Sequence, residues 1–261
     1  MEKERTFLEE FFGFGGYERP VEGFMSFEHL LFVTILMIVM ILLAVILGKK
    51  NKNESDKIKN KVLVASAILI DGFEIFKIII LCLRSSSLEP ILYTLPLFLC
   101  SIQLITIPLA AFSKGKVKQA SLDFVLIFGI LGAVLGTYGA GNNYSSYPVL
   151  SFDNVVSGIT HAISGFASLY ILLSGMASMK KENIKISFGI LLSFCVLAYI
   201  ANIILEYNYM FLMRGDGTPY DIFYNLVNGS PIFYPLIVVL LFIVYISLFY
   251  YVYYLIKKKA K

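Results

Sequence analysis

Two side chains of this sequence could together carry out nucleophilic chemistry, a cysteine and a histidine that both lie inside long apolar runs. Cys100 lies in YTLPLFLCSIQLI (93–105), and His161 lies in NVVSGITHAISGFASLY (154–170). A thiol becomes a nucleophile when a nearby base lowers its pKa, and imidazole is the side chain that titrates near neutral pH. Because the other histidine, His29, lies near the end of its run, His161 is the better candidate for that base. The residues alone leave open whether the two meet or whether each only packs.

A second group of polar residues lies in VLVASAILIDGFEIFKIIILCL, where charge is expensive because the surroundings are apolar. Asp71, Glu74 and Lys77 are spaced three residues apart and therefore share one arc of a helix. Lys77 can neutralise Glu74, which leaves one carboxylate over. The group is either an internal ion pair that fixes the rotation of the helix, or a site for a substrate or a proton.

Three further residues are candidate contributors to substrate binding: His29, Asn208 and Tyr209. The last two lie in a connection, Tyr207–Pro231, that mixes aromatic and turn residues. Such a segment is either a lid folded onto the mouth of a site or a plain connector. With only two histidines and no CxxC spacing among the three cysteines, the sequence predicts no metal site and no redox motif.

The elements that must position these residues are predicted to be membrane-spanning helices. Of the 261 residues, 58% are hydrophobic and 15% are charged, whereas a soluble domain carries about a quarter charged residues. Seven apolar runs are long enough to cross a bilayer as helices, which takes about 20 residues. They cover about 26–48, 62–83, 89–112, 120–141, 155–178, 186–206 and 232–256. We therefore expect an all-α bundle of seven transmembrane helices that forms one domain over residues 1–261.

The distribution of lysine and arginine predicts the orientation of this bundle. Basic residues concentrate after the first, third and fifth runs and in the C-terminal tail, which together hold 16 of the 22. Positive charge marks the cytoplasmic side of a membrane protein. We therefore expect a multi-pass protein of the cell membrane with its N-terminus outside and its C-terminus in the cytoplasm. These clusters are explained by topology, so no nucleic-acid partner is expected; a homo-oligomer stays open.

Depth in the membrane can be counted from the outer end of each run at about 1.5 Å per residue. The count places Lys77 and His161 about 9 Å deep, Glu74 about 13 Å and Cys100 about 17 Å. The polar residues thus favour the outer half, and we expect a cavity that opens to the exterior. On this count a direct Cys100–His161 hydrogen bond requires a strongly tilted helix.

Small residues at Gly132 and Gly136, in GILGAVLGTYGAG, predict close approach of a neighbouring helix. The absence of a preceding strand argues against a nucleotide loop.

Three features together resemble the YwaF family of bacterial integral membrane proteins. They are PLFLCSIQLITIPLA, the histidine of the fifth run, and NYMFLM followed by a proline and then by a Tyr-Pro at the start of the last run. That family in turn resembles the eukaryotic transmembrane protein 164 family, whose members are acyltransferases that use a cysteine and a histidine to acylate lysophospholipids.

The resemblance implies roles for two residues. His161 matches the family histidine and would be the base, and Cys100 would be the nucleophile that accepts the acyl group. In the eukaryotic pattern the cysteine directly follows the proline, whereas here Pro96 is followed by Leu97 and Phe98, and Cys100 comes one turn later.

The sequence therefore favours a lipid-modifying membrane protein of acyltransferase type, with membrane lipids as partners, an acyl phospholipid as donor and no soluble cofactor. Glu74, Lys77, Asn208, Tyr209 and His29 are the candidate binding residues. The alternative is a non-enzymatic transporter or lipid-binding protein that uses Asp71, Glu74 and Lys77. A third reading is a relative that has lost catalysis and kept the lipid pocket.

Overall fold

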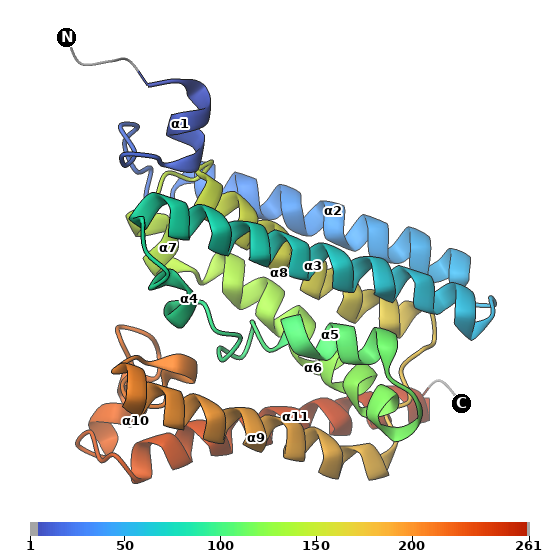
Figure 1. Ribbon diagram of the computed structural model, residues 1–261. Helices are drawn as coiled ribbons and strands as arrows, with labels where there is room; N and C mark the ends of the chain where they lie inside the picture. The colour runs from blue at the N-terminus through green and yellow to red at the C-terminus, as the bar shows by residue number, and fades with distance from the viewer. Residues whose placement is uncertain (1–4, 260–261) are drawn as a thin grey trace.

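The computed structural model describes residues 5–259, and the regular structure over that range is helical (Figure 1). The elements are α1 (Phe7–Phe12), α2 (Phe27–Asn51), α3 (Asp56–Ser85), α4 (Pro90–Tyr93), α5 (Gln103–Phe112), α6 (Gly115–Tyr138), α7 (Gly141–Ser146), α8 (Phe152–Leu173), α9 (Lys181–Leu205), the 3₁₀ turn η1 (Tyr209–Phe211), α10 (Asp221–Leu226) and α11 (Phe233–Lys259). The all-α prediction is confirmed for this part of the chain.

Five of the described helices are long and apolar enough to cross a membrane: α2, α6 with its extension α7, α8, α9 and α11. A sixth, α3, has 30 residues, which is about 45 Å of helix, but Asp71, Glu74 and Lys77 interrupt its apolar character. Sequence signals set several ends. Ser26 and Ser151 cap the N-termini of α2 and α8 through their side chains, and Gly175, with a φ of +75°, follows the end of α8.

The helix predicted over 89–112 is not continuous, and here the sequence prediction is wrong. The chain forms only the short α4, then runs without helix from Thr94 to Ile102, and resumes as α5. Pro96 explains the break, because proline has no N–H to donate and disfavours helical geometry in the residue before it. The Ser101 hydroxyl then holds the irregular turn by accepting from the N–H of Phe98 and donating to its carbonyl. Cys100 therefore lies on a loop within the bundle and not on a helix.

Helix α6 lies at the centre of the molecule. It packs against α5 and α8 on one side and against α9 on the other, while α2 and α3 pack on α8 (Figure 1). The residues from Ala120 to Gly129 are all buried, whereas α2, α9 and α11 leave many apolar side chains exposed. A helix that is buried all round is a core element, and one with an exposed apolar face is suited to contact lipid.

A buried carboxylate joins α6 to the neighbouring pair α9 and α11. Asp123 accepts hydrogen bonds from the N–H and hydroxyl of Ser178, the N–H of Met179, the amide of Asn183 and the hydroxyl of Tyr250. A buried charge is tolerated when it is fully hydrogen-bonded in this way.

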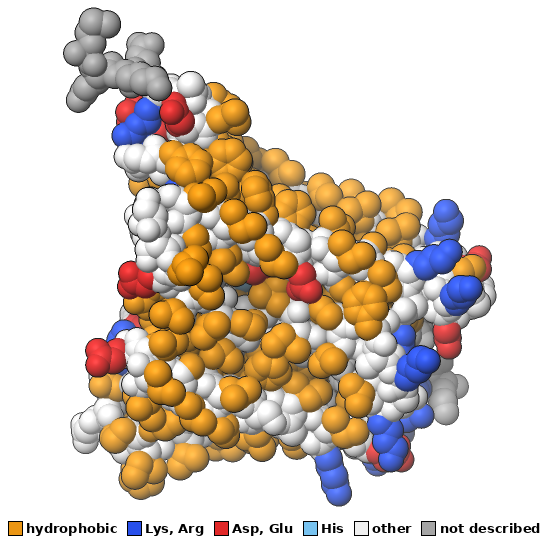
Figure 2. Space-filling view, viewed as in Figure 1, with side chains coloured by type: hydrophobic (Ala, Val, Ile, Leu, Met, Phe, Trp, Pro, Cys, Tyr) orange, Lys and Arg blue, Asp and Glu red, His pale blue; other side chains and the backbone are white. Residues whose placement is uncertain are grey.

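Charged side chains lie mainly at the ends of the bundle. Figure 2 shows lysine and arginine gathered at the right-hand end, where α2 meets α3, α5 meets α6 and α8 meets α9 (Figure 1), with a broad apolar surface between the ends. This is the surface pattern of a protein embedded in a bilayer.

Candidate functional site

A cavity of about 310 Å³ lies among α3, the non-helical residues 94–102 (the irregular segment), α7 and α8. Both Cys100 and His161 line it, together with serine, threonine and asparagine side chains and a few apolar ones. The cavity thus combines a nucleophile, a base and neutral polar groups, which is the composition expected of a site that binds a polar ligand.

The Cys100 thiol and the His161 imidazole lie next to each other in this cavity, close enough to interact electrostatically. The other ring nitrogen, Nδ1 of His161, lies 2.7 Å from the carbonyl oxygen of Ser157. Because a carbonyl can only accept, Nδ1 carries a hydrogen, and Nε2 is the nitrogen left to exchange a proton with the thiol. A nucleophile paired with a base that a third group orients is the arrangement used in covalent catalysis.

Two glycines of α6 make room for this pair. A Cβ atom on Gly136 would lie 1.9 Å from Cδ2 and 2.0 Å from Nε2 of His161, and a Cβ on Gly132 would lie 3.3 Å from Cβ of Cys100. Residues four apart share a face of a helix. A neighbouring helix packs closely at Gly136, as predicted, whereas at Gly132 the neighbour is the segment without helix that carries Cys100. One face of α6 therefore backs both members of the pair.

The depths counted from the sequence do not hold at Cys100, because the count assumed a helix from residue 89. Residues 94–102 lie outside any helix, so the helical rise of about 1.5 Å per residue does not apply to them. The thiol therefore reaches His161 without the strong tilt that the helical count requires.

The charged residues of α3 lie beside the pair. Glu74 and Lys77 form an ion pair with 2.5 Å between Oε1 and Nζ, and both line the cavity. Their side chains are 12% and 19% exposed, so the pair is largely shielded from solvent. Asp71 lines a neighbouring groove instead, and its Oδ1 is buried with no hydrogen-bond partner among the described residues.

The structure does not bring His29 to the cavity. This side chain is fully buried against Tyr144, with ring centroids 3.9 Å apart. Its Nδ1 accepts from the N–H of Met25, and its Nε2 donates to the carbonyl of Thr137, both at 3.1 Å. Thr137 lies in the last turn of α6, where carbonyls lack helical partners. His29 therefore fixes the end of α6 next to Gly136.

Asn208 and Tyr209 also lie outside the cavity lining. The Asn208 amide bonds within its own loop, whereas Tyr209 reaches the segment that carries Cys100: its hydroxyl donates to the carbonyl of Leu92, and its ring lies 5.1 Å from that of Phe98. The side-chain amide of Asn202 holds Tyr209 by donating to its carbonyl and accepting from its N–H. The loop after α9 thus packs against the irregular segment and the end of α4 and helps to hold them in place.

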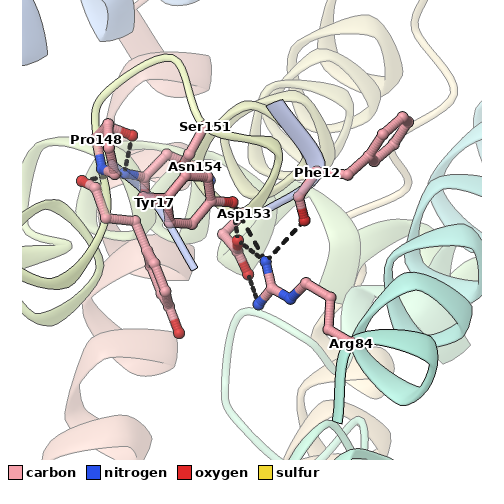
Figure 3. Close-up of polar contacts among 8 residues, drawn as sticks. Phe12, Tyr17, Arg84, Pro148, Ser151, Asp153 and Asn154 are labelled. Carbon is pink, nitrogen blue, oxygen red and sulfur yellow. Dashed lines mark hydrogen bonds and ion pairs between the residues drawn. The ribbon is translucent and has the colours of Figure 1, made fainter. Parts of the chain in front are cut away.

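The sequence analysis missed an ion-pair cluster at the end of the bundle where α3 ends and α8 begins. Figure 3 shows the Arg84 guanidinium between Asp153, Tyr17 and the carbonyl of Phe12. Its two nitrogens lie 2.6 and 3.1 Å from the Asp153 carboxylate, which also accepts from the Tyr17 hydroxyl. Burial and this hydrogen bond raise the pKa of Tyr17, so the phenol stays a donor.

This Arg84–Asp153 cluster joins the helices that carry Glu74, Lys77 and His161, and it ties the N-terminal segment to them. A signal was present in the sequence. Arg84 is in the last turn of α3 and Asp153 in the first turn of α8, where each charge complements the helix dipole.

Within residues 5–259, no group of three or more histidine, cysteine or acidic side chains is arranged to hold a metal ion. The chemistry that the cavity offers is that of the thiol, the imidazole and the neighbouring ion pair.

Long apolar helices around a polar cavity define a multi-pass membrane protein. The TMEM164 family model matches residues 24–256, and the chain belongs to that family. No curated protein and no solved structure matches the chain.

Proposed function

We propose that this protein is a membrane-lipid acyltransferase that uses Cys100 as nucleophile and His161 as general base and acid. The observation that carries the proposal is that the two side chains lie next to each other in one cavity, backed by the same face of α6. Membership of the TMEM164 family supports a lipid substrate, as does the apolar surface around the bundle. The donor is an acyl phospholipid, the acceptor is a lysophospholipid, and no soluble cofactor takes part.

The reaction proceeds in two halves. His161 Nε2 takes the thiol proton, and the Cys100 thiolate attacks the ester carbonyl of the donor. The tetrahedral intermediate collapses with cleavage of the ester C–O bond, and the imidazolium gives its proton to the departing oxygen, which releases a lysophospholipid. His161 next removes a proton from the acceptor hydroxyl, which attacks the thioester. The C–S bond breaks, and the thiolate regains a proton from the imidazolium.

The carbonyl of Ser157 has a defined part in this scheme. It accepts from Nδ1–H throughout and so keeps Nε2 directed at the reacting atoms. It also stabilises the imidazolium that forms in each half-reaction.

We also propose a full membrane topology for the chain. Helix α3 and the chain from α4 to α5 would add two crossings to the five long apolar helices, with the N-terminus outside and the C-terminus in the cytoplasm. The protein would be a YwaF-type member of its family in a bacterial cell. The lysine-rich end supports this orientation. The cell membrane is then the location.

A second candidate is a non-enzymatic lipid transporter or binding protein. The observation that favours it is the shielded Glu74–Lys77 pair in the same cavity, which could recognise a charged head group. In that case Cys100 and His161 would only pack against each other.

The experiment is acyl transfer from a labelled phospholipid to the purified protein in liposomes. We expect a hydroxylamine-labile acyl adduct on Cys100, detected by intact mass and peptide mapping, and labelled lipid product once lysophospholipid is added. Cys100→Ser removes the adduct, and His161→Gln slows its formation by about 10²- to 10⁴-fold, the usual contribution of a general base. Cys82→Ser is the matched control, since Cys82 is also half-buried but lies away from the cavity lining.

Full transfer in Cys100→Ser contradicts the proposal. Lipid binding without any adduct, lost in Glu74→Gln and Lys77→Met but kept in Cys100→Ser, supports the second candidate instead.

A further inference from the structure

A second hollow, of about 520 Å³, lies on the surface between α3 and α5. We call it the α5 groove. It is lined by the apolar side chains Leu104, Ile105, Pro108, Leu109 and Phe112, and by Asp71 and Ser113. Leu109 is 37% exposed and Phe112 is 63% exposed, so the groove is open to the surroundings.

The α5 groove adjoins the cavity that holds Cys100. Leu104 lines both hollows and lies four residues after Cys100 in the chain. From Leu104 to Phe112 the groove follows α5 for about 12 Å. A long ligand could therefore have one end at the thiol and the rest of its length along α5.

The exposed side chains of the groove are apolar, and so is the surface between the charged ends of the molecule (Figure 2). The groove runs along α5 toward the lysine-rich end, where α5 meets α6. In the proposed topology this surface faces the acyl chains of the bilayer. Leu104, Ile105, Leu109 and Phe112 offer no hydrogen-bonding groups, so what they fit is hydrocarbon.

Charge distinguishes the two ends of such a ligand. Among the residues that line the groove, Asp71 and Ser113 are the polar ones and none is a cation, so the groove disfavours an anionic lipid head group. The polar cavity, with its serine and threonine hydroxyls and the Glu74–Lys77 pair, suits an ester group and the head group next to it.

We propose that the α5 groove binds the acyl chain of the donor lipid while the ester carbonyl lies at Cys100, and that the groove selects the chain by length. This inference rests on the proposed acyl transfer for the selectivity, but not for the binding of the chain. Leu104, at the junction, marks where the chain meets the ester.

The first test measures binding without transfer. A phosphatidylcholine that carries a diazirine in the middle of its acyl chain is irradiated in liposomes with Cys100→Ser protein, and the crosslinked peptide is identified by mass spectrometry. We expect crosslinks within residues 104–112, and we expect Leu109→Trp, which fills the groove, to abolish them. The matched control is Leu192→Trp on α9, where the replaced leucine is 42% exposed and lies outside the groove.

The second test measures selectivity. Thioester formation on Cys100 is compared for dipalmitoyl- and dioctanoylphosphatidylcholine. We expect Leu109→Trp to lower the palmitoyl-to-octanoyl rate ratio by about tenfold, the scale on which apolar pockets discriminate alkyl length. Phe112→Ala, a truncation at an exposed position that the fold tolerates, should raise the ratio, and Leu192→Trp should leave it unchanged.

The outcomes separate the two proposals. Crosslinks in the groove without any thioester support the groove and overturn the acyltransferase. Thioester formation with crosslinks elsewhere and an unchanged chain-length ratio overturns the groove and leaves the acyltransferase standing.

Discussion

At the scale of single residues, the site depends on the absence of side chains as much as on their presence. His161 fills the space next to Gly136, so a Cβ added to that glycine would lie only 1.9 Å from the ring, far inside van der Waals contact. A Cβ added to Gly132 would make a close but tolerable contact with Cys100. The ring can turn toward the thiol only because the facing residue of α6 has no Cβ.

We therefore predict that Gly136→Ala lowers acyl transfer by about 10²-fold, since a displacement near 1 Å at a reacting group has that effect. Overpacking should also lower the free energy of unfolding by about 1–3 kcal/mol. Thioester formation and thermal unfolding in detergent measure the two effects. Gly132→Ala should show a smaller loss, because its added carbon meets Cys100 at 3.3 Å.

Gly189→Ala on α9 is the control, because a Cβ there meets nothing within 4 Å. It should keep full activity and gain slightly in stability, as alanine is the better helix former. Equal activity of Gly136→Ala and Gly189→Ala would show that the His161 ring position is unimportant.

At the scale of elements, Cys100 is placed by a segment without helix that other elements hold. The Tyr209 hydroxyl donates to the carbonyl of Leu92 in α4, and the Tyr209 ring packs against the ring of Phe98 in this segment. The Ser101 hydroxyl fixes the turn of the segment. A loop at membrane depth is tolerated when it is buried in protein or lines a cavity, and this half-buried segment lines one. The Arg84–Asp153 cluster joins α3 to α8, two of the helices that line the cavity.

We predict that Arg84→Met lowers the free energy of unfolding by about 3–5 kcal/mol, because it leaves the shielded Asp153 carboxylate without its cationic partner. Thermal unfolding in detergent measures this. The double variant Arg84→Met with Asp153→Leu should recover much of the loss, since two apolar partners replace a broken pair.

Arg214→Met is the matched control, because the Arg214–Asp216 pair is also 2.6 Å long but its arginine is more than half exposed. An exposed pair contributes about 0–1 kcal/mol. Similar losses in Arg84→Met and Arg214→Met would mean that the cluster does not join the helices as described.

At the scale of the whole molecule, charge is divided between the ends and apolar surface lies between them (Figure 2). The proposed topology places the connection of α2 and α3 in the cytoplasm and the connection of α3 and α4 outside. Both connections carry exposed serines, Ser55 and Ser87, which offer matched positions for labelling.

We predict that, in intact cells, a membrane-impermeant thiol reagent labels Ser87→Cys and spares Ser55→Cys until the membrane is permeabilised. Mass-shift detection measures the labelled fraction, and the parent protein gives the background from its three native cysteines. The reverse pattern would invert the proposed orientation.

Some features of the protein follow from the sequence by itself, because they are properties of local composition. Long apolar runs can satisfy their backbone groups in lipid only as helices, so the helical class could be predicted. The i, i+3 spacing brought Glu74 and Lys77 together, and the small residues at 132 and 136 predicted close packing. His161 was selected because it was the histidine deepest in an apolar run.

Other features were decided only by the tertiary structure. Cys100 meets His161, 61 positions further along the chain, because Pro96 breaks the predicted helix and α6 offers a glycine face to both, and no local pattern encodes that distance. His29 had the right chemistry but is fixed to the end of α6, and Asn208 bonds within its own loop. Composition sets the medium in which a segment is stable, whereas contacts between distant segments depend on how whole surfaces pack, and those contacts place the cavity.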